Sequence, residues 1–277
     1  MENPSPSSSA PPSSSAPSSV PPASAPHVAL FVTCLVDLMR PSTGFAAVKL
    51  LEGAGCRVTV PDSQTCCGQP AYNAGDQKDA QGIARMTIQA LEGFDYVVAP
   101  SGSCAGMIKI HYPKLFADEP AMAERAETVA ACTWELTAFL ADVMHYRPVG
   151  VRFEKQVTYH DSCSGLRELG VKQQPRTLLA DVRELVLSEA DCAEVCCGFG
   201  GLFCVKYQDI SVAMVDKKID DILSTGANTV VGGDLGCLMN IAGRARRRGA
   251  PVDVWHVAEV LAGMTGEAGP IGGDADD

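Results

Sequence analysis

The stretch TCCGQPAYNAG, from Thr65 to Gly75, places two cysteines side by side with a glycine directly behind them. Neighbouring side chains on a β-strand point to opposite faces of the sheet, so a Cys-Cys pair cannot serve one buried face there. We therefore expect the pair to lie in a turn or to take part in chemistry. A second Cys-Cys-Gly, Cys196 to Gly198 in VCCGFGGLFC, indicates that the chain contains an internal repeat.

Other cysteines fall into the same register. Eight of the twelve cysteines form aligned pairs, whose members are separated by 129 to 133 residues. The pairs are Cys34 with Cys163, Cys66 with Cys196, Cys67 with Cys197, and Cys104 with Cys237.

Each half also repeats one order of apolar patterns. Short β-rich runs, such as HVALFV before Cys34 and KQVTYH before Cys163, alternate with helical patterns, and each half reads as three strand-helix units. This alternation predicts an α/β fold: two similar Rossmann-like halves related by internal duplication, each with a mostly parallel sheet covered by helices. Ligands of such sheets bind beyond the carboxyl ends of the strands, and we expect the aligned cysteines to converge there.

The pattern divides the chain into four segments. Residues 1–26 are almost entirely Pro, Ser and Ala, without the apolar and basic stretches of a signal peptide, and we expect a disordered tail. A first Cys-Cys-Gly domain at 27–150 and a second at 151–266 follow, divided near the stretch YRPVGVRF, where Pro and Gly interrupt the pattern. Residues 267–277 form an acidic, glycine-rich tail.

Charge and composition limit the function. A net charge of −11 argues against general attraction to nucleic acid or anionic lipid, and no apolar run is long enough to span a bilayer. We therefore expect a cytoplasmic protein with no nucleic acid partner and no membrane span. Because the cytosol keeps thiols reduced, twelve cysteines favour metal binding or redox chemistry over a disulfide framework.

The spacing of the cysteines bears on the choice of metal. Soft thiolate ligands select zinc, copper(I) or iron-sulfur clusters. Structural zinc sites commonly contain Cys-x-x-Cys pairs, and this sequence has none, which disfavours zinc without excluding it in one half. An iron-sulfur cluster accepts ligands from separated loops, including adjacent cysteines that reach different iron atoms. The glycine behind each pair lets the chain turn sharply and lets backbone amides approach the sulfurs.

The first cysteine set has a recognisable spacing. Cys34, 31 residues, Cys66-Cys67-Gly68, 35 residues and Cys104 resemble the Cys-Cys-Gly (CCG) domain found in heterodisulfide reductase and in the iron-sulfur subunits of glycolate and anaerobic glycerol-3-phosphate oxidases. Longer stretches are similar to the lactate utilization protein A family: PSGSCAGM, YHDSCSGLRELGVKQQPR, CCGFGGLF and CLMNIAGRARRRGAPVDVWHVAEVL. The resemblance extends roughly from Val28 to Met264.

The resemblance implies a cytoplasmic iron-sulfur electron-transfer subunit of a complex that oxidises L-lactate to pyruvate. Its implied partners are a ferredoxin-like iron-sulfur subunit and a third lactate utilization subunit. The implied cofactor is an iron-sulfur cluster, of the 4Fe-4S type, with one or two per chain. The implied cluster and metal ligands are Cys34, Cys66, Cys67, Cys104, Cys163, Cys196, Cys197 and Cys237.

The sequence departs from the reductase pattern at one point. There the final cysteine opens a Cys-x-x-Cys, whereas Met107 and Asn240 stand at the corresponding positions here. Four thiolates per half remain, enough for an ordinary cubane cluster or a zinc ion. The second half has more glycine and a nearby extra cysteine, so we expect the two halves to be occupied unequally.

Two other functions are consistent with these residues. The chain could be a thiol-disulfide or hydroxy-acid oxidoreductase acting at its own cluster, with His160 and Asp161 as catalytic proton carriers. A capping pair at a strand end is the structural alternative for these two residues. The third function is a zinc-bound scaffold subunit.

The remaining cysteines and histidines are expected to be structural. Lone cysteines usually behave as small buried hydrophobes. Cys192 and Cys204 flank the second pair, so the alternative for either one is to substitute as a ligand. The residues in this group are Cys56, Cys132, Cys192, Cys204, His111, His145 and His256.

Overall fold

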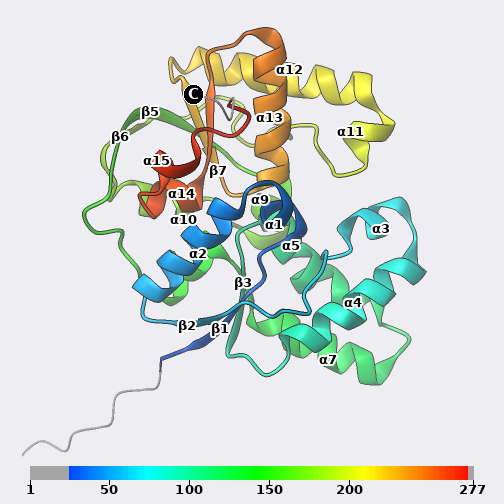
Figure 1. The fold of residues 1–277 in the computed structure, drawn as a ribbon. Coiled ribbons are helices and arrows are strands. Elements are labelled where there is room, and N and C mark those ends of the chain that lie inside the picture. The colour runs from blue at the N-terminus through cyan, green and yellow to red at the C-terminus, as the bar shows by residue number, and fades with distance from the viewer. Residues whose placement is uncertain (1–24, 274–277) are drawn as a thin grey trace, which may run out of the picture.

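A computed structural model of the protein describes residues 25–273 (Figure 1). Most of the predicted N-terminal tail, residues 1–24, and the end of the predicted C-terminal tail, residues 274–277, lie outside this range. Within the described part of the chain, no helix combines the length and the apolar character that crossing a bilayer requires.

Two four-stranded parallel sheets form the centre of the molecule, which confirms the predicted α/β fold with two similar halves. The first sheet has the order β2-β1-β3-β4, and the second repeats it as β6-β5-β7-β8. The strands are β1 (His27–Leu30), β2 (Arg57–Thr59), β3 (Tyr96–Ala99), β4 (Thr133–Glu135), β5 (Arg152–His160), β6 (Arg183–Leu187), β7 (Thr229–Gly232) and β8 (Asp253–His256).

The helices follow the strands in the same order in both halves. Those of the first half are α1 (Cys34–Met39), α2 (Pro41–Gly53), α3 (Gln69–Ala74), α4 (Gln77–Leu91), α5 (Gly102–Gly106), η1 (Met107–His111), α6 (Tyr112–Leu115), α7 (Pro120–Cys132), α8 (Leu136–Ala138) and η2 (Phe139–Val143). Those of the second half are α9 (Cys163–Leu169), α10 (Gln173–Leu179), α11 (Phe203–Lys206), α12 (Gln208–Ser224), α13 (Leu235–Arg248), α14 (Val257–Leu261) and α15 (Thr265–Ala268).

Each half contains a fourth strand that the sequence pattern did not indicate. β4 consists of TWE and β8 of DVWH, and each pairs in parallel with the third strand of its half. Neither run contains the Val-Val pair that marks the equally short strands β3 (YVVA) and β7 (TVVG).

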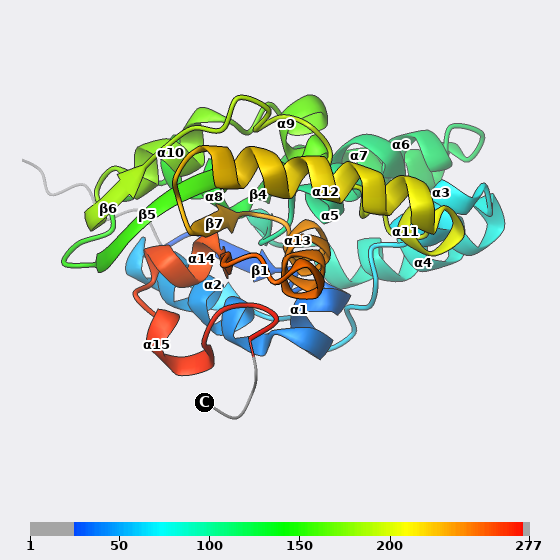
Figure 2. The same cartoon turned by 90° about the horizontal axis from the view of Figure 1, so that it is seen from above.

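Alternating side chains of β1 show how the layers are built. Val28 and Leu30 face a core that includes residues of both halves, whereas Ala29 and Phe31 face a core beneath α4 and α7. In the second half, α12 and α13 cover the sheet face that points away from the core shared by the two halves (Figure 2). Their apolar residues form a third core against that face. The shared central core joins the two halves, and the predicted boundary at residues 150 and 151 stays a prediction.

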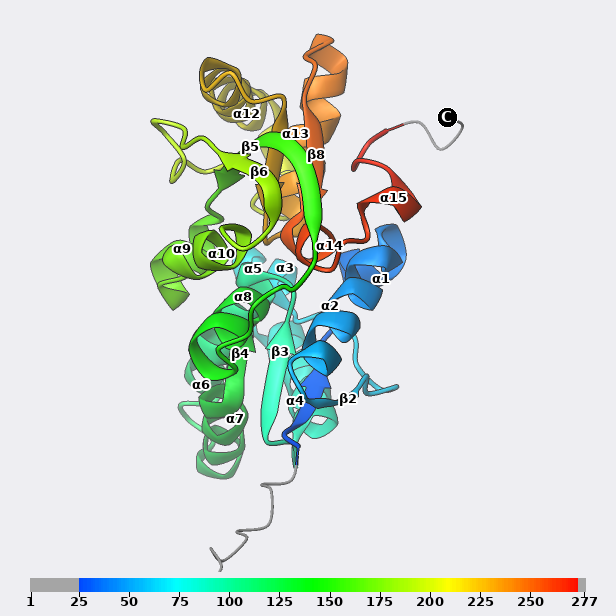
Figure 3. The same ribbon diagram turned by 90° about the vertical axis from the view of Figure 1, so that its left-hand side faces the viewer.

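The sheet of the second half lies above that of the first in Figure 3, and the helix contacts between the halves follow an approximate two-fold relation. α1 and α9, which follow the first strand of each half, contact α13 and α5, which follow the third strand of the other half. α2 likewise packs on α14, and α10 on α8. The carboxyl ends of the two sheets therefore face each other across the interface.

A buried ion pair crosses this interface. Arg40 Nε donates to both carboxylate oxygens of Glu259, at 2.9 and 3.1 Å, and Glu259 is fully buried. Ser42 Oγ donates to the same carboxylate at 2.6 Å, and the Arg40 guanidinium lies 5.5 Å from the centre of the Trp255 ring. The pair fixes the turn between α1 and α2 against α14.

We expect Arg40→Ala to lower the free energy of unfolding by about 3 to 5 kcal/mol, because it leaves the Glu259 carboxylate buried without its cation. Urea denaturation of the variant and the parent protein measures this difference. The matched control is Arg125→Ala, which breaks the exposed pair with Glu92 and should cost much less. Equal losses in the two variants would contradict the role given to the buried pair.

Candidate metal centres

The loops after the strands of the first half carry its four aligned cysteines. Cys34 is the first residue of α1, after β1, and Cys66 and Cys67 lie in the loop between β2 and α3. Cys104 lies in α5, after β3. Three neighbouring strands thus deliver four thiols to one edge of the sheet.

The second half repeats this arrangement. Cys163 is the first residue of α9, Cys196 and Cys197 lie in the segment that follows β6, and Cys237 lies in the first turn of α13. Every aligned cysteine therefore comes after the carboxyl end of a strand, at the edges of the sheets that face each other.

The four thiols of each half form a continuous row. In the first row, Cys34 is within hydrogen-bonding reach of Cys66, Cys66 of Cys67, and Cys67 Sγ lies 3.5 Å from Cys104 Sγ. The second row joins Cys163, Cys196, Cys197 and Cys237 in the same order. In both rows the first two cysteines are half-buried and the last two are buried.

In each row, the surroundings of one cysteine favour its ionised thiolate form. Hydrogen bonds from the thiols of Cys34 and Cys67 hold the pKa of Cys66 well below its usual range. The pKa of Cys34 is raised in turn, first by its hydrogen bond to Cys66 and then by burial. Cys196 has a lowered pKa for the same reason, through hydrogen bonds from Cys163 and Cys197. A row of thiols thus stabilises a single negative charge and resists a second.

The glycine behind each cysteine pair has the role expected of it. Gly68 and Gly198 have φ angles of 81° and 83°, in the left-handed region that favours glycine. Their N–H groups donate to the Sγ atoms of Cys66 and Cys196, at 3.4 and 3.3 Å. At Gly198, a Cβ would also lie 2.8 Å from the carbonyl oxygen of Ser211. The sharp turn therefore aims a backbone donor at the sulfur.

A carboxylate of the second half caps a cysteine helix of the first half. Asp234 precedes α13 but does not cap it. Instead, Asp234 Oδ2 accepts from the Ser103 N–H at 2.9 Å and from Ser101 Oγ at 3.2 Å, at the start of α5. Because α5 carries Cys104, the second half helps to position a thiol of the first row.

A cavity of about 240 Å³ opens beside the first row of thiols. All four of these cysteines line it, together with Phe199, Leu202 and Asp234 of the second half. The first site is therefore complete only when both halves are packed together.

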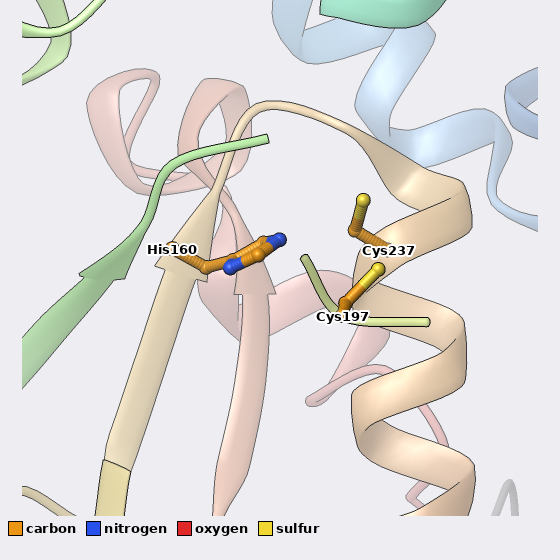
Figure 4. Close-up of side chains that lie close together, drawn as sticks. All are labelled: His160, Cys197 and Cys237. Carbon is orange, nitrogen blue, oxygen red and sulfur yellow. The ribbon is translucent and has the colours of Figure 1, made fainter. Parts of the chain in front are cut away.

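The two candidate proton carriers have different surroundings. Asp161 is 2% exposed, and both of its carboxylate oxygens accept from the Arg176 guanidinium, at 2.8 and 2.9 Å. His160 is 3% exposed, and neither ring nitrogen has a hydrogen-bond partner. Asp161 thus has a structural ion pair, whereas His160 is directed toward the second row of thiols (Figure 4).

The cysteines without a partner in the repeat lie apart from the rows or at their margin. Cys56 is buried, and the Cys132 and Cys204 thiols donate to the backbone carbonyls of Val129 and Gly201. The expectation that lone cysteines are buried is wrong for Cys192, which is exposed, whereas Cys132 and Cys204 are half-buried.

Two residues near the rows were not indicated by the sequence. Asp234 has the sequence position of an ordinary helix cap, and Lys218 that of a solvent-facing residue of a charged helix. Lys218 is in fact 2% exposed, its Nζ donates to the carbonyls of Cys192 and Ala193, and burial lowers its pKa. These two carbonyls lie 25 and 26 positions earlier in the chain, and the Asp221 carboxylate is 4.0 Å from Lys218 Nζ.

The donor set fits a thiolate-bound metal centre. Each row gathers four sulfurs from three loops, and such soft donors select zinc, copper(I) or iron-sulfur clusters. The raised pKa values beside Cys66 and Cys196 show that a further thiolate needs a positive charge nearby, which a metal supplies. The unpartnered ring of His160 adds a buried nitrogen donor beside the second row.

Comparison with known proteins agrees with this geometry. Residues 28–109 and 157–242 match the cysteine-rich domain family CCG. A protein of Exiguobacterium sp. named lactate utilization protein A is 50% identical over 238 residues, which cover 85% of this chain and 97% of that protein. One of the same name from Bacillus licheniformis is 49% identical over 84% of this chain and 98% of its own length.

A likeness in fold alone extends to a solved structure. The crystal structure of a hypothetical protein from Helicobacter pylori matches with a TM-score of 0.63 at 10% identity, over 90% of this chain and 50% of that one.

We expect iodoacetamide at pH 6 to modify Cys66 in the metal-free protein at least roughly tenfold faster than Cys132, because thiolates are the reactive species. The two cysteines are similarly half-buried, but burial raises the pKa of Cys132. Raising the pH to 9 should accelerate Cys132 and change Cys66 little. Peptide mass mapping measures both rates, and equal rates at pH 6 would refute the proposed charge distribution.

Proposed function

The chain belongs to the cysteine-rich CCG domain family, with relatives named lactate utilization protein A, and from this we propose that it is an iron-sulfur electron-transfer subunit. The complex that it serves oxidises L-lactate to pyruvate. The observation that carries the proposal is the convergence of four thiols in each half at facing sheet edges.

The proposed ligands are the eight cysteines of the two rows, in domains that span residues 27–150 and 151–266. A 4Fe-4S cluster bound by a row would supply one-electron transfer. The chain's own residues hold the sulfurs in place: Gly68 and Gly198 direct N–H groups at them, and Asp234 fixes the start of α5. Cys67 and Cys197, at 3% and 1% exposure, lie where water is excluded.

The proposed setting is a multi-subunit system in the cytoplasm. The name that the relatives share supports a part in lactate utilization. The partners are a ferredoxin-like iron-sulfur subunit and a third lactate utilization subunit. No Gly-x-Gly-x-x-Gly or Gly-x-x-x-x-Gly-Lys cradle occurs in the sequence, so we assign the flavin or nicotinamide that accepts electrons from lactate to a partner.

We expect the anaerobically purified protein to contain about four to eight iron atoms per chain, with matching acid-labile sulfide. Its visible absorption should bleach with dithionite. Two zinc ions per chain without labile sulfide, and spectra unchanged by dithionite, would instead identify a scaffold subunit. Turnover of lactate by the isolated, reconstituted chain would identify an enzyme acting at its own cluster.

We expect Cys67→Ser and Cys197→Ser each to lower the iron content, because each removes a thiolate from the middle of a row. The losses should be unequal, since the surroundings of the two rows differ. Cys132→Ser is the matched control and should keep the full iron content, because Cys132 belongs to neither row. Metal analysis of the three variants measures this, and equal losses for Cys67→Ser and Cys197→Ser would count against unequal centres.

A further inference from the structure

We infer that His160 is a nitrogen ligand of the second metal centre, beside Cys197 and Cys237. This inference rests on the proposed function and gives the second centre a chemical identity that the first does not have.

The first argument is the lack of any hydrogen-bond partner for a buried ring. His160 ends β5 at 3% exposure, and both its nitrogens are fully buried without a protein partner. A buried polar atom left unpaired costs about 1 to 3 kcal/mol. His256, which ends β8 and is also buried, uses both nitrogens: Nε2 with the Pro100 carbonyl and Nδ1 with the Ala258 N–H. A structural histidine at this sheet edge is therefore hydrogen-bonded, and His160 is not.

The second argument is geometric. A ring nitrogen of His160 and the Sγ atoms of Cys197 and Cys237 lie within 4.8 Å of one another, and Figure 4 shows the ring directed toward the two sulfurs. Metal-nitrogen bonds of about 2.0 Å and metal-sulfur bonds of about 2.3 Å place ligand atoms at such separations. Neither ring nitrogen of His160 has a hydrogen-bond partner, so a lone pair of the ring is available to a metal.

The third argument is the difference between the halves. Three residues before the first cysteine of each row stand Phe31 and His160, so the first half has a fully buried phenyl ring where the second has the imidazole. Asp161 does not orient the imidazole, since both its oxygens bond to Arg176. The first centre thus has four thiols at hand, and the second has four thiols and a nitrogen.

The chemical consequence concerns the reduction potential. A cubane cluster has four iron atoms, so His160 takes the place of one of the four thiolates in the second centre. This exchange raises the reduction potential, because imidazole brings no negative charge. Lys218, which is close enough to influence both His160 and Cys197, acts in the same direction. We therefore expect the second centre to have the higher potential of the two.

The test uses the full chain, purified anaerobically after growth with ¹⁵N-histidine. Pulsed electron paramagnetic resonance of the dithionite-reduced protein should show one strongly coupled histidine nitrogen. His160→Phe, which copies the first half, should abolish this signal, whereas His145→Asn, at an exposed site, should keep it. A weakly coupled nitrogen in the parent protein, as from a hydrogen bond to sulfur, or a strong signal that survives in His160→Phe, would overturn the inference.

A second readout does not depend on a paramagnetic signal. In potentiometric titration followed by visible absorption, His160→Cys should keep the iron content of the parent and lower the potential of one centre while the other stays unchanged. Unchanged potentials in His160→Cys would contradict nitrogen ligation.

The experiments distinguish a failure of the proposed function from a failure of this inference. If zinc is found in place of iron, X-ray absorption at the zinc edge still tests His160, by the loss of a nitrogen neighbour in His160→Phe. A zinc shell of sulfur alone in the parent protein would overturn the inference.

Discussion

Four thiols at one sheet edge cannot all ionise side by side without a neighbouring positive charge. In each row one cysteine, Cys66 or Cys196, accepts hydrogen bonds from its neighbours and holds the charge, while the adjacent thiols Cys34 and Cys163 have raised pKa values. A metal removes this conflict by replacing the shared protons with a cation. The strand ends, the glycines with left-handed backbone conformation and the facing sheets together hold the four sulfurs of each row in place.

The two halves depend on each other although each repeats the same plan. The Asp234 side chain does not cap α13, the helix that it precedes, but accepts a hydrogen bond at the start of α5. Phe199 and Leu202 of the second half line the cavity beside the first row. The pairing of α1 with α13 and of α5 with α9 places both rows along the interface. A duplicated fold has thus become one unit in which the second half shapes the first site.

Much of this could be predicted from the sequence, and the reason is the regularity of the fold. Alternating strands and helices indicated two parallel sheets, and the repeat spacing then placed all eight cysteines at carboxyl ends. The fourth strands escaped detection because TWE and DVWH mix charged and aromatic residues and lack the Val-Val pair of the equally short strands β3 and β7. The roles of Lys218 and Asp234 escaped detection because the backbone groups to which they hydrogen-bond lie 25 or more positions away in the chain.

The sequence alone determined the class of chemistry, since two aligned sets of cysteines with a glycine behind each pair are a property of the chain itself. It also singled out His160 and Asp161 as neighbours of a predicted ligand, without distinguishing between them. Only the tertiary structure separated the two, by pairing Asp161 with Arg176 and leaving the His160 ring buried and unpartnered. The physical reason is that burial and hydrogen bonding depend on residues brought together by folding, whereas spacing along the chain does not.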